Sequence, residues 1–245
     1  MNISIVIPAY NEENALISTF IEVDNYLKKN EKFDKYEIIL VDDGSTDKTY
    51  KIMKNIAVSY PNVAILRFEK NEGVGAALFA GFKKSKFENI YWLPADNQVP
   101  IIEFDKLIDY INDYDIIIAR RKNRADNVIR KFFSKFYQMI INLFFGLGVN
   151  DINATKLIKR SVIENLNCKV KSGFFDAELL IRAKNRNYKI IEVEVSHQQR
   201  CADKQKGASF KTIINIFIDL FYNIYLLKKE FYNEKIESQK SENET

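Results

Sequence analysis

The stretch "YEIILVDDGSTD", residues 36–47, runs from a continuous apolar segment into a polar turn. Apolar runs rich in β-branched residues and bounded by turn signals are typical of strands buried on both faces of a parallel sheet. Gly44 permits a tight turn directly after the strand, and Ser45 or Thr46 is placed to cap a following helix. The stretch therefore predicts a buried strand that leads through a short turn into a helix.

The same alternation of strand and helix recurs along the chain. Apolar runs lie at residues 3–7, 36–41, 63–68, 89–93 and 114–119, and helix-patterned segments lie between them at residues 12–29, 47–59, 74–86 and 101–112. A later run, residues 188–197, alternates apolar and acidic residues and predicts a strand with one solvated face. This order predicts an α/β fold with a mostly parallel central sheet flanked by helices, which binds ligands at the C-terminal ends of its strands.

Length, charge and cysteine content narrow the class of protein. The 245 residues, 47% of them hydrophobic, suffice for one large α/β domain with a sizeable core. A formal net charge of +4 is too small to indicate nucleic acid, so we expect no nucleic-acid partner. Cys168 and Cys201 lack a metal-binding spacing and favour a reducing compartment. The N-terminus lacks the features of a signal peptide, so we expect a cytoplasmic protein.

Two apolar segments, residues 130–148 and 211–229, stand apart from the sheet pattern. Neither reaches the roughly 20 apolar residues of a membrane-spanning helix. In the first segment Lys131 and Lys135 recur at helical spacing opposite an apolar face. Core or dimer packing and helices lying in a membrane interface are both consistent with this pattern, so a homodimer and a peripheral membrane contact stay open. Residues 230–245 are polar and predict a disordered tail.

Polar residues follow the first strand in "PAYNEE", residues 8–13. Asn11 is placed to cap the next helix, with Glu12 and Glu13 in its first turn. Capping leaves Tyr10 unexplained, and its ring is suited to stacking on a nucleobase.

Two adjacent carboxylates, Asp42 and Asp43, follow the second strand. Like charges side by side cost free energy unless something is bound, and a carboxylate there can accept the imide N–H of uracil or the N–H groups of guanine. A strand end that merely turns is the alternative.

After the third strand, Gly73 and Gly75 open a helix whose backbone N–H groups can face an anion.

These motifs occur together in an order that resembles a known family. "PAYNEE", "VDDGSTD", "NEGVGAALFAG" and "PADNQ" have the order and spacing seen in family-two glycosyltransferases with the A-type nucleotide-sugar fold. The sequence looks most like the branch of dolichol-phosphate mannosyl- and glucosyltransferases and bacterial polyprenyl-phosphate glycosyltransferases. The resemblance covers about residues 2–210 and implies one domain, residues 1–210, with a nucleotide-binding half to residue 98 and an acceptor half from residue 99.

The resemblance also implies which residues bind a UDP- or GDP-linked sugar. The nucleoside pocket and its surroundings would comprise Pro8, Tyr10, Glu12, Asp42, Asp43, Asn71, Gly73 and Asp96. In this set Asp42 would support its loop, and Asn71 and Gly73 would lie near the sugar nucleotide.

"PADNQ", residues 94–98, falls on the D-x-D metal motif of the family. The resemblance puts Asp96 in the place of the second aspartate and Gln98 at a further ligand position, whereas Pro94 replaces the first aspartate. Mg²⁺ or Mn²⁺ takes oxygen ligands and tolerates substrate phosphates, so one carboxylate, one amide oxygen and two diphosphate oxygens form the expected set. His197, the only histidine, would reach the metal or a phosphate, although a lone histidine is more often structural.

Four residues are candidates for the chemistry. The guanidinium fork of Arg200 matches phosphate oxygens. Asp151, Asp176 and Glu178 correspond to family positions near the acceptor, with Asp151 the first choice, although the first turn of a helix explains Asp176 and Glu178 equally well. A hydroxyl acceptor needs a general base, whereas a lipid phosphate is already an anion and mainly needs positioning.

The expected activity is transfer of a sugar from a nucleotide-diphosphate sugar to a polyprenyl phosphate on the cytoplasmic face of a membrane. Such products would feed surface polysaccharide or glycoprotein synthesis. Two alternatives stay open: direct transfer to a glycan hydroxyl, and a catalytically decayed nucleotide-sugar-binding protein, which Pro94 permits.

Overall fold

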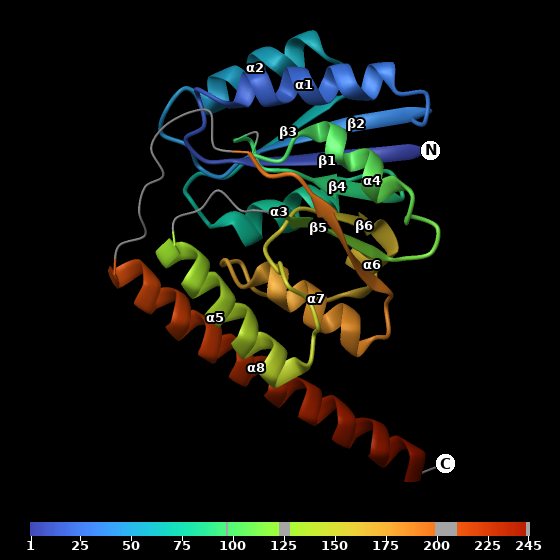
Figure 1. Ribbon diagram of the computed structural model, residues 1–245, viewed down its shortest axis with the longest axis vertical. Helices are drawn as coiled ribbons and strands as arrows, with labels where there is room; N and C mark the ends of the chain where they lie inside the picture. Colours follow the sequence, from blue (N-terminus) through green and yellow to red (C-terminus); the bar gives the residue numbers. More distant parts are fainter. Residues whose placement is uncertain (97, 123–127, 199–209, 244–245) are drawn as a thin grey trace. The chain divides into compact units, whose positions relative to one another are not determined.

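The computed structural model describes residues 1–96, 98–122, 128–198 and 210–243 (Figure 1). It divides into two compact units, Met1–Gln205 and Lys206–Thr245, whereas the sequence placed this boundary after residue 210. The strands of the first unit are β1 (Asn2–Ala9), β2 (Lys35–Asp42), β3 (Val63–Arg67), β4 (Asn89–Trp92), β5 (Ile116–Arg121), β6 (Lys156–Lys159) and β7 (Ile190–Val195). Its helices are α1 (Leu16–Lys29), α2 (Thr49–Ser59), α3 (Val74–Lys84), η1 (Ile101–Glu103), α4 (Phe104–Ile108), α5 (Val128–Phe145), α6 (Arg160–Asn165) and α7 (Phe175–Asn185).

The seven strands form one sheet in the order β3-β2-β1-β4-β6-β5-β7. The pairs β1–β2, β1–β4, β2–β3 and β5–β7 are parallel, and β6 runs antiparallel to both β4 and β5. The predicted α/β fold with a mostly parallel sheet is therefore confirmed. The sequence missed β6, because this strand has four residues and its lysines interrupt the apolar pattern.

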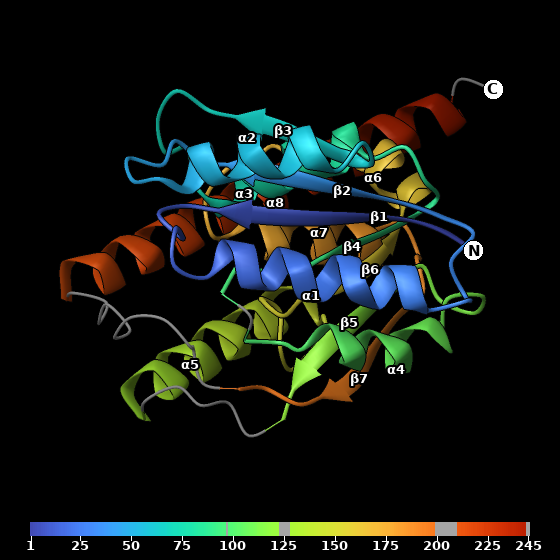
Figure 2. The ribbon, with the colours of Figure 1, turned by 90° about the horizontal axis from the view of Figure 1, so that it is seen from above.

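Helices cover both faces of the sheet, as Figures 1 and 2 show: α1, α2 and α4 lie on one face, and α3, α6 and α7 on the other. This arrangement explains why β1 carries apolar residues on both faces, since Ile3, Ile5 and Ile7 face one layer and Val6 faces the other. Gly81 of α3 lies against Val6 so closely that a Cβ there would overlap the valine side chain.

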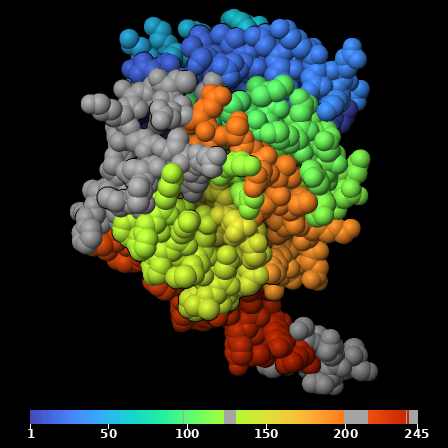
Figure 3. Space-filling view, in the orientation of Figure 1, coloured from blue at the N-terminus to red at the C-terminus, as the bar shows by residue number. Residues whose placement is uncertain are grey.

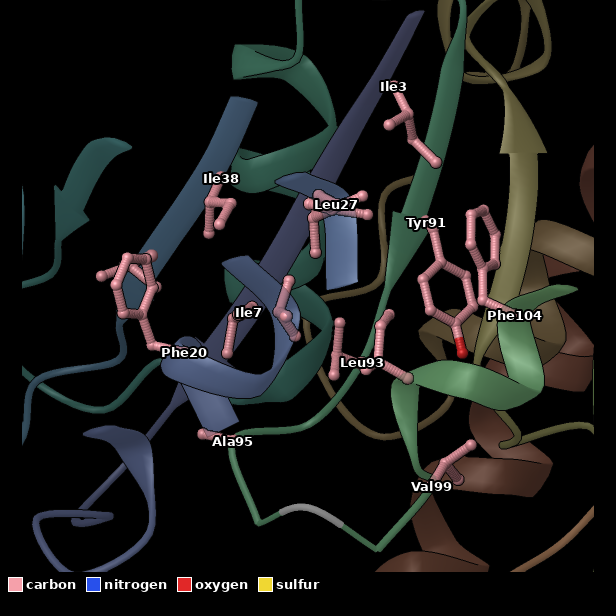
Figure 4. Packing of buried hydrophobic residues seen from close by; sticks show 14 of the residues in the cluster. Ile3, Ile7, Phe20, Leu27, Ile38, Tyr91, Leu93, Ala95, Val99 and Phe104 are labelled. Atoms are coloured by element: carbon pink, nitrogen blue, oxygen red, sulfur yellow. The ribbon is translucent and has the colours of Figure 1, made fainter. Parts of the chain in front are cut away.

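One part of the core lies between the sheet and the α1, α2 and α4 layer. Figure 4 shows Ile3, Ile7 and Ile38 of the strands packed with Phe20 and Leu27 of α1. Next to them the ring of Tyr91 in β4 stacks on Phe104 of α4, with ring centroids 4.4 Å apart. The predicted helix over residues 101–112 is shorter than expected, because only η1 and α4 are helical there.

The second unit contains one helix, α8 (Phe210–Asn243), of 34 residues. The sequence predicted a helix over residues 211–229 followed by a disordered tail. The second expectation is wrong for residues 230–243, which continue the helix, and their many Glu, Lys and Gln residues are good helix formers. Within the residues that the structure describes, no helix is long and apolar enough to cross a membrane.

Candidate active site

The turns that follow β1 and β2 lie at the same edge of the sheet, because these two strands are parallel and in register up to Ala9 and Asp42. The backbone N–H of Asn11 donates to Ser45 Oγ (3.0 Å), and Asn11 Oδ1 accepts the backbone N–H of Thr46 (2.8 Å). The two turns are therefore fixed to each other before any ligand is considered.

These contacts correct the expected helix caps. Asn11 does not cap α1, which begins at Leu16 and has no acidic residue in its first turn. Neither Ser45 nor Thr46 caps α2; instead Asp47 Oδ1 accepts the backbone N–H of Thr49 at 2.9 Å.

The two glutamates of "PAYNEE" also contact the turn after β2. Glu13 Oε2 accepts the backbone N–H of Lys48 (3.0 Å), and the backbone N–H of Glu12 donates to Thr49 Oγ1 (2.8 Å). Pro8 pairs with Val41 inside the β1–β2 ladder.

Tyr10 directly follows β1 and keeps 45% of its surface exposed. An exposed ring at the C-terminal end of a strand is available for stacking on a flat ligand.

Asp43 holds the loop that follows β3. Its carboxylate accepts the side-chain amide of Asn71 (3.0 Å) and the backbone N–H groups of Glu72 (2.8 Å) and Gly73 (3.1 Å). Burial raises the pKa of Asp43, and the hydrogen bonds from Glu72 and Gly73 oppose this shift. Gly44 has a φ of +71°, and a Cβ there would overlap the Lys70 carbonyl carbon. The structure thus brings Asp43, Asn71 and Gly73 together, in a loop that packs closely on Gly44.

Asp42 is fully buried beside Asp43. Its Oδ1 accepts the backbone N–H of Ser45 (3.0 Å), and its Oδ2 lies 3.2 Å from Nε of Arg67 at the end of β3. The Arg67 guanidinium in turn lies 3.9 Å from the centroid of the Tyr50 ring. Arg67 and Tyr50 were not among the residues predicted from the sequence, although an arginine at the end of an apolar strand could have indicated a partner for Asp42.

The segment "PADNQ" connects β4 to η1 at the same edge of the sheet. Thr19 Oγ1 donates to the carbonyl of Ala95 (2.9 Å), and Oδ1 of the half-buried Asp96 accepts the backbone N–H of Gln98 (3.1 Å). The carbonyl of Gln98 accepts the backbone N–H of Gln198 at 2.9 Å. The segment after β7, which contains His197, is therefore adjacent to the predicted metal position.

Oxygen donors suited to Mg²⁺ or Mn²⁺ are present here, in Asp96 and Gln98. Among the residues that the structure describes, no group of three or more His, Cys, Asp or Glu side chains is arranged to hold a metal ion. One carboxylate and one amide oxygen fit a cation that takes several of its ligands from a bound diphosphate. Arg200 lies outside the described residues.

Asp151, the first choice for a catalytic carboxylate, is 3% exposed and is bound by Arg121. Arg121 donates from its backbone nitrogen (3.1 Å), Nε (2.8 Å) and Nη2 (2.7 Å) to the two carboxylate oxygens. Glu192 Oε1 accepts the backbone N–H of Asp151 at 2.8 Å. This carboxylate is held as one half of a bidentate ion pair.

Asp176 forms a second buried ion pair, with Lys156 of β6. Lys156 Nζ lies 2.5 Å from Asp176 Oδ1, donates to the Ala154 carbonyl (2.7 Å) and lies 5.7 Å from the Trp92 ring centroid. Burial lowers the pKa of Lys156 and raises that of Asp176, while their mutual attraction opposes both shifts.

Glu178 is 1% exposed and accepts hydrogen bonds on both oxygens. Its donors are the backbone N–H groups of Lys169 and Val170 and the Nε of Arg182. Asp176 and Glu178 do lie in the first turn of α7. Arg121 and Lys156, which pair with Asp151 and Asp176, were not among the residues predicted from the sequence.

Comparisons with known proteins identify the relatives of this chain. Undecaprenyl-phosphate 4-deoxy-4-formamido-L-arabinose transferase of Proteus mirabilis is 32% identical over 222 residues, which are 89% of this chain and 66% of that protein. Dolichyl-phosphate beta-glucosyltransferase ALG5A of Trichomonas vaginalis is 33% identical over 219 residues, which are 83% of this chain and 68% of that protein. The chain thus spans about two thirds of the length of these relatives.

Solved structures show the same fold. Glucosyl-3-phosphoglycerate synthase of Mycobacterium tuberculosis, crystallised with Mn²⁺, UDP and phosphoglyceric acid, superposes with a TM-score of 0.66 at 17% identity, over 89% of this chain and 78% of that one. TarS of S. aureus gives a TM-score of 0.57 at 18% identity, over 80% of this chain and 60% of that one. The expected A-type fold is confirmed. The model of glycosyl transferase family 2 matches residues 4–167, and the chain belongs to this family.

Proposed function

We propose that this chain transfers a sugar from a nucleotide-diphosphate sugar to a polyprenyl phosphate. Membership of a glycosyltransferase family supports the transfer reaction. The names of the two relatives above specify undecaprenyl phosphate and dolichyl phosphate, which supports the acceptor class.

The main support for a phosphate acceptor comes from the hydrogen-bond and ion-pair partners of the three candidate carboxylates, Asp151, Asp176 and Glu178. Arg121 binds Asp151, Lys156 binds Asp176, and Glu178 accepts hydrogen bonds on both oxygens. A carboxylate whose oxygens already accept hydrogen bonds from an arginine, a lysine or backbone N–H groups is poorly placed to take a proton from an acceptor hydroxyl. A hydroxyl acceptor needs a general base, whereas a phosphate attacks as an anion without one. This arrangement therefore favours a phosphate acceptor.

The nucleotide would bind at the edge where β1, β2 and β4 end. Tyr10 offers an exposed ring for the base, and Asp43 offers a carboxylate for the N–H edge of uracil or guanine. The buried Asp42 would support this loop through its hydrogen bond from the Ser45 N–H. Asn71 and Gly73 would lie near the sugar diphosphate, because Asp43 holds their loop beside the base pocket.

Asp96 and Gln98 would hold a divalent cation, Mg²⁺ or Mn²⁺, together with diphosphate oxygens. When bound, this cation would stabilise the negative charge of the departing diphosphate. We propose Arg200 as a further phosphate contact and His197 as a residue close enough to assist, since its segment is hydrogen-bonded to Gln98.

The acceptor would be presented by a membrane against α5. Phe132, Met139 and Leu143 share one face of this helix and are 64%, 57% and 79% exposed. Figure 3 shows the α5 segment, in yellow-green, on the molecular surface. The exposed Lys131 and Lys135 flank this face and would contact lipid phosphates, as in helices that lie in a membrane interface.

A shallow groove of about 460 Å³ runs along the same helix, lined by Lys135, Gln138, Met139, Asn142, Leu143, Val149 and Asn150. Its mixture of apolar side chains and one lysine suits the start of a prenyl chain and its phosphate. We also propose that the reaction takes place on the cytoplasmic face of the membrane, where nucleotide sugars are available and cysteines stay reduced. The products would enter polysaccharide or glycoprotein synthesis. Packing of α5 against a second copy of the chain is the competing use of this face.

Transfer assays with a panel of UDP- and GDP-sugars and undecaprenyl phosphate in detergent test the proposal directly. We expect a lipid-linked sugar detectable by mass spectrometry, and its loss in Asp96→Ala while circular dichroism shows an intact fold. Transfer to soluble glycans without transfer to lipid phosphate would refute the acceptor assignment. Nucleotide binding without any turnover would instead identify a decayed, binding-only protein.

A further inference from the structure

Glu178 and its neighbours on α7 hold a backbone segment, residues 168–172, which we call the strap. Glu178 accepts the N–H of Lys169 on both oxygens (3.1 and 3.0 Å) and the N–H of Val170 at 2.8 Å. One turn later on α7, Arg182 donates from Nε to the same carboxylate at 2.8 Å. Hydrogen bonds to a buried charge are among the stronger ones, so Glu178 fixes residues 169 and 170 of the strap firmly to α7. At the end of the strap the Ser172 carbonyl accepts the backbone N–H of Phe175 at 3.1 Å.

The strap contacts the start of α3 directly. The carbonyl of Lys171 accepts the backbone N–H of Ala76 (3.0 Å), and Lys171 Nζ pairs with Glu72 at 2.8 Å. A Cβ added to Gly73 would lie 3.0 Å from the Lys171 carbonyl oxygen, and one added to Gly75 would overlap the Ser172 carbonyl. The glycines therefore permit the strap to approach this turn.

The loop from Asn71 to Gly73 thus lies between the Asp43 carboxylate and the strap that Glu178 holds. On one side Asp43 accepts three hydrogen bonds from the loop. On the other side the strap, held by Glu178, bears against Gly73 and the first turn of α3.

Packing holds the strap only in part. A cavity of about 390 Å³ lies between the strap and α3, lined by Phe68, Glu72, Ala76, Phe79, Ala80, Cys168, Lys169, Val170 and Lys171. On this side the strap faces an open pocket instead of close-packed protein, so fewer side-chain contacts fix it. The position of the strap therefore depends strongly on its polar contacts.

We propose that Glu178 is a positioning residue for nucleotide binding: through the strap it holds the Asn71–Gly73 loop in place against Asp43. The inference rests on the proposed function, which assigns this loop to the nucleotide. It gives Glu178 a role different from the acceptor-side catalytic role that the family resemblance suggested.

The first test compares Glu178→Gln with Glu37→Gln. Glu37 is a matched control because it is also buried and accepts hydrogen bonds, from Ser4 Oγ (2.7 Å) and the Lys86 N–H (2.6 Å), at the opposite end of the sheet. Calorimetric titration with UDP and GDP should show about tenfold weaker binding in Glu178→Gln, as loss of one charged hydrogen bond implies. Glu37→Gln should bind as the wild type does. In turnover assays KM for the nucleotide sugar should rise more than kcat falls.

A glycine pair repeats the comparison without altering Glu178. Gly75→Ala should displace the strap and weaken nucleotide binding, because the new Cβ would overlap the Ser172 carbonyl. Gly173→Ala is its control, since a Cβ there meets no atom within 4 Å. This pair keeps the test decisive if Glu178→Gln does not fold.

Cys168 provides a readout on the strap itself. Cys168 is 7% exposed, and burial raises the pKa of its thiol to about 12, so a disulfide reagent should modify it slowly while the strap is in place and faster when the strap moves. In a Cys201→Ser background, which leaves Cys168 as the single thiol, UDP should slow this modification, because coupling between two sites is reciprocal. Glu178→Gln should speed the modification and reduce the protection by UDP.

The outcomes separate the two proposals. A wild-type protein that binds neither UDP nor GDP overturns the proposed function, and the positioning role falls with it. Wild-type binding that is unchanged in both Glu178→Gln and Gly75→Ala overturns the positioning role alone. An equal loss of affinity in Glu178→Gln and Glu37→Gln does so too, since it would reflect general destabilisation.

Discussion

Arg121 binds Asp151 through three hydrogen bonds, one from its backbone nitrogen and two from its guanidinium. The pair joins the end of β5 to the turn before β6, and the side chains are 15% and 4% exposed. A carboxylate enclosed in this way contributes to the fold by its pairing. The arrangement favours a structural role for Asp151 over that of a general base.

Arg121→Met should lower the free energy of unfolding by about 3 kcal/mol, because it leaves the Asp151 carboxylate buried without its cation. Urea unfolding followed by circular dichroism measures this change. The double variant Arg121→Met/Asp151→Leu removes both charges and should recover most of the loss. A single variant within about 0.5 kcal/mol of the wild type would show that the pair adds little.

Asp151→Asn separates structure from catalysis in the same pair. It keeps the size of the side chain and removes its charge, so we expect lower stability and turnover in proportion to the folded fraction. A fully folded Asp151→Asn protein that has lost turnover would instead identify Asp151 as a catalytic residue.

The Lys156–Asp176 pair predicts a spectroscopic change. Lys156 Nζ lies 5.7 Å from the ring centroid of Trp92, the only tryptophan in the chain. Lys156→Met should alter the Trp92 emission and cost about 3 kcal/mol, since Asp176 would lose its partner. Adding Asp176→Leu should restore stability, and retained transfer in that double variant would show that Asp176 is structural. An unchanged emission spectrum in Lys156→Met would contradict the contact.

The sequence predicted the central parallel strands β1, β2 and β4 well because each is a mostly apolar and buried run. The strand β6 was not predicted, because a lysine such as Lys156 normally indicates a solvent-exposed position. Its burial depends on the ion pair with Asp176, 20 positions later. The capping role expected of Asn11 was wrong for a similar reason, because its side-chain oxygen accepts the backbone N–H of Thr46, 35 positions away. Local patterns predict elements and turns, whereas the pairing of polar groups across the fold depends on the tertiary structure.

The same limit applies to the candidate site. The family resemblance put Asp43, Asn71 and Gly73 in one predicted nucleotide site, and in the fold Asp43 accepts hydrogen bonds from Asn71 and Gly73. The resemblance gave no indication that Arg67 lies against Asp42, because that contact joins two adjacent strands whose register sequence alone does not give.

Pro94 should set the strength of metal binding in the absence of nucleotide. Pro94→Asp returns a carboxylate two positions before Asp96, and a second anionic oxygen ligand should tighten binding of a hard divalent cation. We expect a Mn²⁺ affinity at least about tenfold higher than that of the wild type without UDP, and a smaller gain with UDP, whose phosphates already supply ligands. Titration calorimetry with and without UDP measures both. Equal affinities in the two proteins would place the metal elsewhere.

The exposed face of α5 should bind anionic membranes. Burying one phenylalanine or leucine in lipid contributes roughly 1.5–3 kcal/mol, so Phe132→Ser with Leu143→Ser should weaken partitioning onto vesicles more than tenfold. Co-sedimentation with phosphatidylglycerol-containing liposomes measures this loss. Val58→Ser on α2 is the control, because Val58 is 90% exposed but isolated from this face. Unchanged sedimentation of the α5 variant, with a shift from dimer to monomer in analytical ultracentrifugation, would show that the face packs against a second copy of the chain.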